Sequence, residues 1–397
     1  MTASAPLSIL PPLSAEEAEH SARLATFLRE QIAAAGGWID FETFMDLALY
    51  APGLGYYSAG SAKLGAAGDF VTAPESSDLF SRCLARQCAQ VLQVTGGEIL
   101  ELGAGTGRMA AAVLTELEAL GALPERYAIL EVSAELAARQ RERLAALPAP
   151  LRERVVWLER LPERPLHGVI VANEVADALP CRRFILTADG PGELGVELAD
   201  ADPLHDFRDA LRVPDTHLAR ACEEIVTAVP EELPEGYSSE VCLRLAPWIN
   251  SLAACLARGA LLICDYGLPR RHYYHPQRLS GTLRCHYRHR AHDDPYLKPG
   301  VQDITAWVDF TALAEAAPES RLTVAGFTTQ AAFLLGTGIE QLVAAAATDL
   351  ERARLAGEAR RLIMPEEMGE AFKVMALTRG CDVALAGFAV SDLRHLL

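Results

Sequence analysis

A short apolar run followed by closely spaced glycines constrains this chain more than any other feature. Residues 98–102 (Glu-Ile-Leu-Glu-Leu) are typical of a buried parallel strand, and Gly103, Gly105 and Gly107 follow directly. A helical pattern begins at Met109. A strand that leads through glycines into a helix N-terminus brings backbone N–H groups close to a ligand, because no Cβ stands in the way.

The spacing of these glycines narrows the kind of ligand. It is Gly-x-Gly-x-Gly, whereas dinucleotide sites carry Gly-x-Gly-x-x-Gly. Glu101, at the end of the strand, would face any pyrophosphate but would suit a cationic ligand. The stretch resembles the S-adenosylmethionine loop of class I methyltransferases. Taken alone, it also leaves open a nucleotide-binding loop or a purely structural glycine turn.

Length and charge bound the fold and the classes of partner. The chain has 397 residues, so we expect a large core with insertions, or two domains. It carries 53 acidic and 36 basic residues, and its formal net charge is −17. This balance argues against broad nucleic-acid binding, because phosphate contacts need a positive footprint, but it is compatible with a basic protein substrate.

The cysteines and the lack of targeting segments indicate the compartment. The nine cysteines are scattered without a Cys-x-x-Cys pair, so we expect neither a zinc site nor a disulfide framework. The sequence shows no secretory signal and no apolar run of the ~18 residues needed to span a membrane. With no evident mitochondrial transit peptide and a bacterial composition, these features predict a cytoplasmic location in a bacterial cell.

Helices and strands alternate to the end of the chain, which is the signature of a doubly wound α/β sheet. We expect strands at residues 99–102, 127–131, 155–158, 167–172, 259–265, 322–328 and 372–377. The predicted regions are a flexible N-terminus (1–14), a helical region with a ligand-covering loop (15–94), two core halves (95–183 and 259–397) and an insertion between them (184–258).

Several local patterns predict where elements begin and end. Ser14 and Asp40 are typical N-cap residues for the first two helices. The insertion is expected to open with a hairpin that turns through residues 189–192, followed by an acidic, proline-spotted stretch up to residue 236. Residues 333–346 are apolar and predict a single helix.

Polar residues follow several of the predicted parallel strands, where ligands bind in open α/β sheets. Glu131 ends the second strand, the position at which a ribose diol is gripped in nucleotide-binding folds. Its alternative role is a helix N-terminal acid before Ser133. Asn173 and Glu174 follow the fourth strand and are the strongest site candidates, although they could also cap the next helix.

The segment from residue 267 to 300 is rich in arginine and histidine. A basic, aromatic lid over the site is the favoured interpretation, with an RNA-contacting patch or a solvated loop as alternatives. The histidines are spaced by three residues without a cysteine, which is weak support for a metal site. The basic and imidazole residues are Arg270, Arg271, His272, His275, Arg278, Arg284, His286, Arg288, His289, Arg290 and His292.

Taken together, these positions resemble the MidA-type family of S-adenosylmethionine-dependent methyltransferases, whose mitochondrial members assist respiratory complex I assembly. The resemblance runs from about residue 44 to 379. Its motifs lie at residues 49–57, 68–75, 101–107, 173–174, 177–180, 265–267, 278–283, 302–305 and 308–310. The departures are Val175–Asp177, where the family usually has Leu before the Asp, and Ser76–Ser77, where an Ile-Ser pair is common; neither removes a polar group.

The resemblance implies a class I methyltransferase fold, with a Rossmann-like, seven-stranded, mostly parallel sheet and with S-adenosylmethionine as cofactor. It also implies symmetric dimethylation of an arginine in a protein substrate, with a complex I subunit as a candidate partner. The cofactor-binding residues would be Glu101, Gly103, Gly105, Gly107, Glu131, Glu159, Arg160, Thr72, Pro74 and Glu75.

The catalytic residues would be Glu174, Asn173 and Asp177. A guanidinium is protonated at physiological pH and attacks only if carboxylates orient it and localise its charge away from the attacking nitrogen. Glu174 is the first choice for this role, Asn173 would hold the substrate, and Asp303 and Asp309 are secondary acids. An RNA methyltransferase, or an assembly factor that binds the cofactor without turnover, remain as alternative functions.

Overall fold

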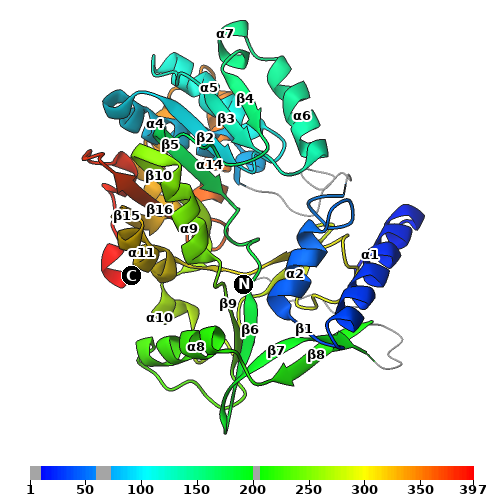
Figure 1. Cartoon of the computed structure of the whole chain (residues 1–397). Coiled ribbons are helices and arrows are strands. Elements are labelled where there is room, and N and C mark those ends of the chain that lie inside the picture. The colour runs from blue at the N-terminus through cyan, green and yellow to red at the C-terminus, as the bar shows by residue number, and fades with distance from the viewer. Residues whose placement is uncertain (1–9, 60–72, 200–205) are drawn as a thin grey trace. The chain divides into compact units, whose positions relative to one another are not determined.

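The computed structural model describes residues 10–59, 73–199 and 206–397. The chain divides into two compact units, both of which appear in Figure 1. The antiparallel unit comprises residues 1–70, 177–245 and 268–309, and the parallel-sheet unit comprises residues 71–176, 246–267 and 310–397. The predicted insertion therefore contributes to both units, since its last residues, 246–258, belong to the parallel-sheet unit.

One mixed sheet organises the parallel-sheet unit, in the order β15-β16-β10-β5-β2-β3-β4. Strands β10, β5, β2, β3 and β4 are mutually parallel, whereas β16 runs antiparallel to both β10 and β15. The α/β class predicted from the sequence is confirmed. The strand bounds are β2 Glu98–Leu102, β3 Tyr127–Leu130, β4 Val155–Leu158, β5 Leu166–Asn173, β10 Leu256–Leu268, β15 Thr323–Thr329 and β16 Phe372–Arg379.

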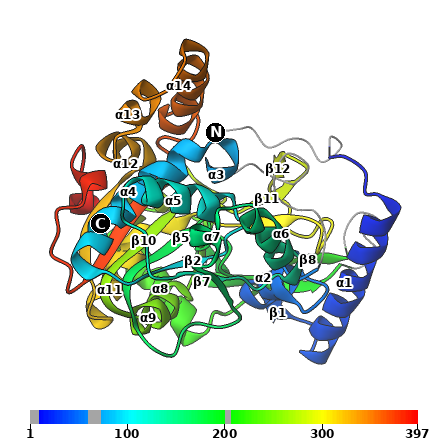
Figure 2. The same cartoon turned by 90° about the horizontal axis from the view of Figure 1, so that it is seen from above.

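Helices cover both faces of this sheet because its strands are apolar on both sides. Ile99, Val169 and Leu262 pack with α4 (Asp78–Thr95) and α5 (Arg108–Ala119) in one buried cluster. The alternate residues of the same strands, such as Leu100 and Ile170, are equally buried and face the opposite way. On that side lie α9 (Leu245–Ala254) and α11 (Phe310–Glu319), as Figures 1 and 2 show.

The remaining helices of this unit include two differences from the sequence-based expectation. The apolar stretch 333–346 is not one helix but two, because the chain turns through Gly338 with a φ of +87°. A further helix, α14, was not predicted; it is strongly polar outside its few buried positions. The bounds are α3 Ala73–Ser76, α6 Ala134–Ala145, α7 Ala149–Arg152, α12 Gln330–Gly336, α13 Ile339–Ala344 and α14 Asp349–Ile363.

The antiparallel unit contains two small sheets. One has the order β1-β7-β6-β9 with β8 paired to β7, and the other has the order β12-β11-β13. The bounds of these strands are β1 Ile39–Asp40, β6 Arg182–Thr187, β7 Gly190–Leu198, β8 Phe207–Arg212, β9 Ser238–Val241, β11 Arg284–Tyr287, β12 Arg290–His292 and β13 Asp303–Thr305. A further short strand, β14 Val308–Asp309, belongs to neither small sheet. The helices are α1 Ala15–Ala34, α2 Phe41–Tyr50, α8 Thr216–Ala228 and α10 Arg270–Tyr273.

The two predicted N-caps of this unit are confirmed. The Ser14 hydroxyl accepts a hydrogen bond from the Glu17 N–H, and the Glu17 carboxylate in turn accepts from the Ser14 N–H, which completes a capping box. Asp40 caps α2 by accepting from the Thr43 N–H at 2.7 Å. These local signals are reliable because each satisfies backbone donors that the helix itself leaves without a partner.

The hairpin of this unit turns earlier than predicted. Thr187 pairs directly with Gly190, so the turn consists of residues 188–189, and residues 190–192 belong to β7. The stretch 199–236, predicted only as acidic and proline-spotted, contains β8 and α8 in its described part. Helix α8 begins at Asp215, whose carboxylate accepts from the N–H groups of His217 and Leu218.

Backbone packing within the large sheet depends on a glycine that the sequence did not single out. Gly168, in β5, has a φ of +126°, and a Cβ there would lie 2.0 Å from the carbonyl oxygen of Glu98 in β2. A side chain at this position would force β5 away from β2, because the contact is with backbone that cannot rotate aside.

We therefore predict that Gly168→Ala lowers the free energy of unfolding by at least about 2 kcal/mol, as expected for overpacking at a rigid contact. Gly357→Ala is the matched control, since Gly357 lies exposed in α14 with nothing within 4 Å of an added Cβ. The control should be neutral or stabilising by up to about 1 kcal/mol. Urea unfolding followed by circular dichroism measures both, and equal stabilities would contradict the argument.

Candidate functional site

The parallel strands deliver most of the predicted site residues to one edge of the sheet. Strand β2 lies between β5 and β3, so the chain direction across the sheet reverses between β2 and β5. Ligands bind at such a reversal, outside the carboxyl ends of the strands. The glycine loop follows β2, Glu131 follows β3, and residues 159–160 follow β4. Asn173 is the last residue of β5, and Glu174 follows it.

The glycine loop takes a backbone conformation that side chains resist. The φ angles of Gly103, Gly105 and Gly107 are +61°, +54° and +80°, all in the left-handed region. A Cβ on Gly107 would also lie 3.2 Å from the Cα of Gln140 in α6. Gly107 serves as the N-cap residue of α5, so the loop ends at a helix N-terminus with its N–H groups exposed to an incoming ligand.

Glu101 is buried directly beneath this loop. One carboxylate oxygen accepts a hydrogen bond from the Tyr127 hydroxyl at 2.7 Å, and the other has no hydrogen-bond partner among the described residues. Burial raises the pKa of Glu101 to about 7, since Tyr127 offsets only part of the desolvation. A buried acid with an unused acceptor can receive a cationic donor such as an ammonium group.

Glu131 is held by two donors. Its carboxylate accepts from the Ser133 N–H at 2.9 Å and from the Gln140 side-chain amide at 2.8 Å. Burial raises the pKa of Glu131 above its usual range, although both hydrogen bonds oppose that shift. The contact with Ser133, the N-cap of α6, is the structural role considered from the sequence, and it leaves further acceptor capacity on both oxygens.

Glu159 and Arg160 lie in the bend that follows β4, and both are exposed. The ion pair of Arg160 among the described residues is with Glu163, at 3.2 Å, and both partners are more than three-quarters exposed. They share the sheet edge with Glu131, but an exposed pair of this kind constrains their side chains little.

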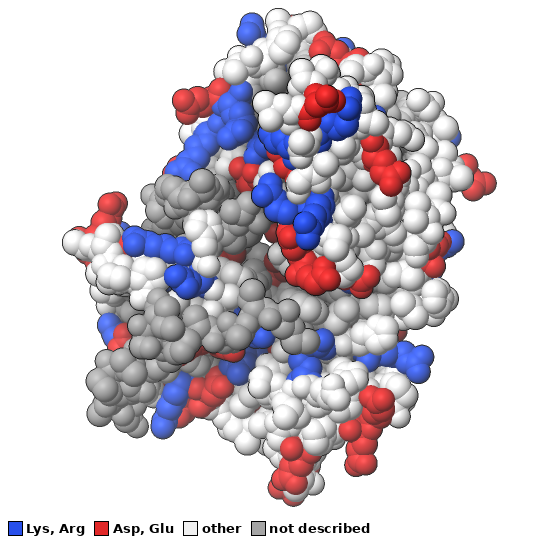
Figure 3. Space-filling model, turned by 180° about the vertical axis from the view of Figure 1, so that it is seen from behind, with Lys and Arg blue, Asp and Glu red and all other residues white. Residues whose placement is uncertain are grey.

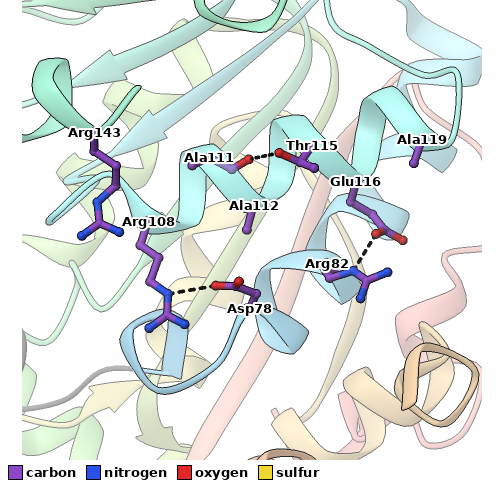
Figure 4. A pocket seen from close by; sticks show the side chains of 9 residues that line it. All are labelled: Asp78, Arg82, Arg108, Ala111, Ala112, Thr115, Glu116, Ala119 and Arg143. Atoms are coloured by element: carbon purple, nitrogen blue, oxygen red, sulfur yellow. Dashed lines mark hydrogen bonds and ion pairs between the residues drawn. The ribbon is translucent and has the colours of Figure 1, made fainter. Parts of the chain in front are cut away.

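The short helix α3 brings Glu75 against the glycine loop. The Thr106 hydroxyl donates to the Glu75 carboxylate, and the Arg108 guanidinium donates to the Glu75 carbonyl oxygen. Arg108 also forms an ion pair with Asp78 at 2.8 Å, which Figure 4 shows at the start of α5. Pro74 is buried in the same turn, whereas Thr72 lies outside the described residues.

Asn173 and Glu174 adopt a strained arrangement at the end of β5. Glu174 has a φ of +51°, which is uncommon for a residue other than glycine. Its N–H donates to the Cys264 carbonyl at 2.9 Å, and the Asn173 side-chain amide donates to its carboxylate at 3.2 Å. Strain of this kind persists only where neighbouring contacts impose it, and it concentrates at functional sites.

Asp265 supplies those contacts, and the sequence analysis assigned it no role beyond a family motif. It is fully buried, and one carboxylate oxygen accepts from the N–H groups of Val175 and Ala176 at 3.2 and 2.9 Å. The other oxygen accepts from the Tyr266 N–H at 2.9 Å. Asp265 therefore fixes the backbone turn that directly follows Glu174. The sequence offered one signal for this role, since Asp265 directly follows the apolar residues 259–264.

The three other predicted acids belong to the antiparallel unit. Asp303 is fully buried and accepts from the Tyr57 hydroxyl at 3.0 and 3.1 Å. Asp309 forms an ion pair with Arg270 at 2.9 Å. Asp177 is buried, and its carbonyl accepts from the backbone N–H of residue 306 at 2.9 Å.

The arginine-rich segment uses much of its charge within its own unit. Arg270 pairs with Asp309, Arg284 with Asp293 and Arg288 with Glu17, while Arg278 donates to the carbonyls of residues 272 and 273. Guanidinium groups engaged in this way offer less charge to phosphates. Basic and acidic side chains are also interspersed on the molecular face drawn in Figure 3.

A cavity of about 510 Å³ is lined by residues of α4, α5 and α6, among them the ion pair of Arg108 with Asp78. Arg82 and Glu116 form an ion pair across it at 2.7 Å, and Figure 4 shows Arg143 on its rim. None of the predicted cofactor-binding or catalytic residues lines it. Among the described residues, no group of three or more His, Cys, Asp or Glu side chains could hold a metal ion.

The fold and the edge site define a class of protein. Residues 83–328 match the model of a family described as "Putative S-adenosyl-L-methionine-dependent methyltransferase". This match covers more than half of the chain, and the chain belongs to this family of S-adenosylmethionine-dependent methyltransferases. The resemblance stated from the sequence motifs is thereby confirmed.

Individual relatives agree with this placement. The mitochondrial protein arginine methyltransferase NDUFAF7 of Danio rerio is 30% identical over 379 residues, covering 88% of this chain and 86% of the relative. The Homo sapiens protein of the same name is 29% identical over 372 residues, with coverages of 86% and 80%. A crystal structure from Burkholderia thailandensis, bound to S-adenosyl-homocysteine, has 45% identity, a TM-score of 0.91, and coverages of 98% and 100%.

S-adenosylmethionine is therefore the cofactor, as predicted. The residues of the site fit this molecule. The left-handed glycine loop carries no side chains that would keep the methionine part of the cofactor away from the backbone. Glu101 offers a buried acceptor oxygen for the ammonium group of the cofactor. In the part of the chain that is described, no helix is long and apolar enough to cross a membrane.

The raised pKa of Glu101 leads to a prediction about stability. Its pKa rises from 4.5 to about 7, so the folded state prefers the neutral acid and loses stability as the pH rises through this range. Without cofactor, Glu101→Gln should be more stable than the wild type at pH 8, by on the order of 3 kcal/mol, and similar to it at pH 4.5. Urea unfolding at a series of pH values tests this, and parallel pH profiles would contradict it.

The role of Asp265 leads to a second prediction. In Asp265→Asn one carboxylate oxygen becomes an NH₂ group. Because each oxygen of Asp265 accepts from a backbone N–H, the NH₂ group faces a donor in both orientations of the amide. We expect a loss of roughly 1–3 kcal/mol in unfolding free energy and faster amide exchange at residues 175 and 176. Asp349→Asn, at an exposed ion pair in α14, is the control and should stay within about 0.5 kcal/mol. Unchanged exchange at those two amides would refute the assignment.

Proposed function

We propose that this chain transfers methyl groups from S-adenosylmethionine to an arginine of a protein substrate. The support is that relatives about 30% identical over most of their length are named protein arginine methyltransferases. Symmetric dimethylation, with a complex I subunit as the candidate partner, extends the same proposal. The net charge of −17 is compatible with a basic substrate segment.

We assign the cofactor half of the site to the residues at the sheet edge. The N–H groups of the glycine loop and the carboxylate of Glu101 would hold the methionine part of the cofactor. The Glu131 carboxylate would accept hydrogen bonds from both ribose hydroxyls. Glu159 and Arg160 would flank the adenine edge. Glu75, tied to the loop by Thr106, would close over the methionine end together with Pro74.

The observation that carries the proposal is the imposed conformation of Glu174. Its left-handed φ of +51° is maintained by the Cys264 carbonyl and by the turn that Asp265 organises. A carboxylate positioned at structural cost, beside an amide side chain and at the edge where ligands bind, suits the recognition of a planar cation. The alternative role, a cap for the next helix, is wrong, because strand β6 and not a helix follows β5.

Bound S-adenosylmethionine supplies a methyl group on a sulfonium, and the transfer is an in-line displacement. The protein's contribution is mainly to hold the attacking nitrogen in line, which can account for several kcal/mol of the barrier. Glu174 would bind the guanidinium, localise its positive charge away from the attacking nitrogen and later accept its proton. Asn173 would fix the orientation of the Glu174 carboxylate, consistent with their 3.2 Å hydrogen bond. Asp177 would contribute a further acid.

The alternatives receive less support. RNA as acceptor rested on the arginine-rich segment, whose residues Arg270, Arg284 and Arg288 form ion pairs within their own unit. An assembly factor without turnover would not require the strained carboxylate at Glu174. Both remain outcomes that the following experiment can detect.

Glu174→Gln should retain S-adenosyl-homocysteine binding, measured by calorimetry, and lose methyl transfer by about 10²-fold or more, the typical effect of removing a group engaged in proton transfer. Mass spectrometry of candidate protein subunits, co-expressed with the wild type or the variant, reads out the transfer. Glu163→Gln, at an exposed residue, is the control and should leave transfer unchanged.

Transfer by Glu174→Gln at the wild-type rate would remove Glu174 from catalysis. A methylated RNA in place of a methylated protein would replace the acceptor. If the wild type binds cofactor but methylates neither, the non-catalytic function would be supported.

A further inference from the structure

Gln140, in α6, connects three segments at the carboxyl edge of the parallel strands, the edge to which we assign the cofactor and which is called the cofactor edge below. The sequence patterns did not single it out. It is completely buried. Its side-chain nitrogen donates to the Glu131 carboxylate at 2.8 Å and to the Gly105 carbonyl at 2.9 Å, and its side-chain oxygen accepts from the Trp157 indole N–H at 3.0 Å. One amide thus links the residue after β3, the glycine loop and β4.

These partners allow only one orientation of the amide. Both hydrogens of the nitrogen point at acceptors, and the oxygen points at a donor, so a flipped amide would place its oxygen against a carboxylate and a carbonyl. The α6 backbone is equally constrained, because the Cα of Gln140 lies against Gly107. Gln140 is therefore a rigid support, since a rotation would break all three hydrogen bonds.

This support determines how Glu131 presents its oxygens. The Ser133 N–H occupies one acceptor position on the first oxygen and Gln140 occupies one on the second. A carboxylate has about four acceptor positions, so Glu131 can accept a further hydrogen bond in its plane besides those from Ser133, Gln140 and the Val132 N–H. Two adjacent hydroxyls on a five-membered ring can donate to one carboxylate, provided that the carboxylate does not rotate.

The link to Gly105 extends the same constraint to the loop. Its carbonyl receives a hydrogen of Gln140, so the peptide units on either side of it hold a fixed orientation. The spacing between the loop and Glu131 is thereby set by one side chain, whose nitrogen is 2.9 Å from one and 2.8 Å from the other. A ligand that spans both would find the site already organised and would lose less affinity to the ordering of side chains.

We propose that Gln140 is a positioning residue that gives the enzyme its selectivity for the ribose diol of the cofactor, by locking the Glu131 carboxylate relative to the glycine loop. The inference rests on the proposed contact of Glu131 with the ribose. Gln140 itself touches no substrate atom, and its effect passes through Glu131 and Gly105.

The test compares two ligands, S-adenosyl-homocysteine and its 2′,3′-dideoxy analogue, by calorimetry on the full-length protein. For Gln140→Met, which keeps the volume but removes all three hydrogen bonds, affinity for the diol ligand should fall by about tenfold, the effect of one hydrogen bond to a charged group. Affinity for the dideoxy ligand should fall by a clearly smaller factor, since that ligand uses the glycine loop but makes no use of Glu131.

Gln87→Met is the matched control. Gln87 is also completely buried in the parallel-sheet unit, and its amide binds Gln90 and the Gly387 N–H, away from the cofactor edge. It should lower stability without altering the affinity ratio of the two ligands. If Gln140→Met does not fold, Trp157→Phe removes the N–H donor that orients the amide, together with part of the ring, and should reduce the same ratio by a smaller factor.

A diol-specific loss in Gln140→Met or Trp157→Phe supports the proposal, whereas equal losses for both ligands would show that Gln140 merely maintains the fold and would overturn it. A wild-type protein that binds both ligands equally would remove Glu131 from the ribose and this inference with it. The proposed arginine methylation would be unaffected, because it is measured by transfer rather than by diol selectivity.

Discussion

The left-handed backbone of the glycine loop is the constraint on which the cofactor edge depends. Because Gly103, Gly105 and Gly107 all have positive φ, the chain can turn sharply from β2 into the N-terminus of α5. Neighbouring segments then bond to the loop itself: Glu75 through Thr106, and Gln140 through the carbonyl of Gly105. The loop is therefore the point where α3, α5 and α6 are joined, and it is also the surface to which we assign the cofactor.

Buried acids provide the electrostatic character of this edge. Glu101 and Glu131 both have pKa values raised by burial, so the protein without ligand holds negative charge there at a cost. In the proposed site, a cofactor that carries a sulfonium and an ammonium would compensate that cost, which an anionic dinucleotide could not do. Asp265 differs in that its carboxylate serves the backbone of residues 175–176, and it organises the site without facing a ligand.

Sequence patterns predicted the elements whose signals are local. The caps at Ser14 and Asp40, the strand 98–102 and the polar residues after each parallel strand follow from neighbouring residues alone. The failures concern signals that are also local: Thr348 caps α14, Gly338 interrupts the apolar stretch with a left-handed φ, and Thr187 pairs with Gly190 across the short hairpin turn. Gln140 was missed because a glutamine within a polar helix has no distinguishing sequence neighbours.

The sequence by itself determined the class of fold, the cofactor loop and the family, because spacing and periodicity are properties of the chain and survive without coordinates. The tertiary structure alone decided which side chains act together. It showed that Glu131, Gly105 and Trp157 share one amide, and that Asp265 holds the turn after Glu174, although 89 residues separate Asp265 from Ala176 in the chain. Hydrogen bonds of this kind form across strands and loops that only folding brings together.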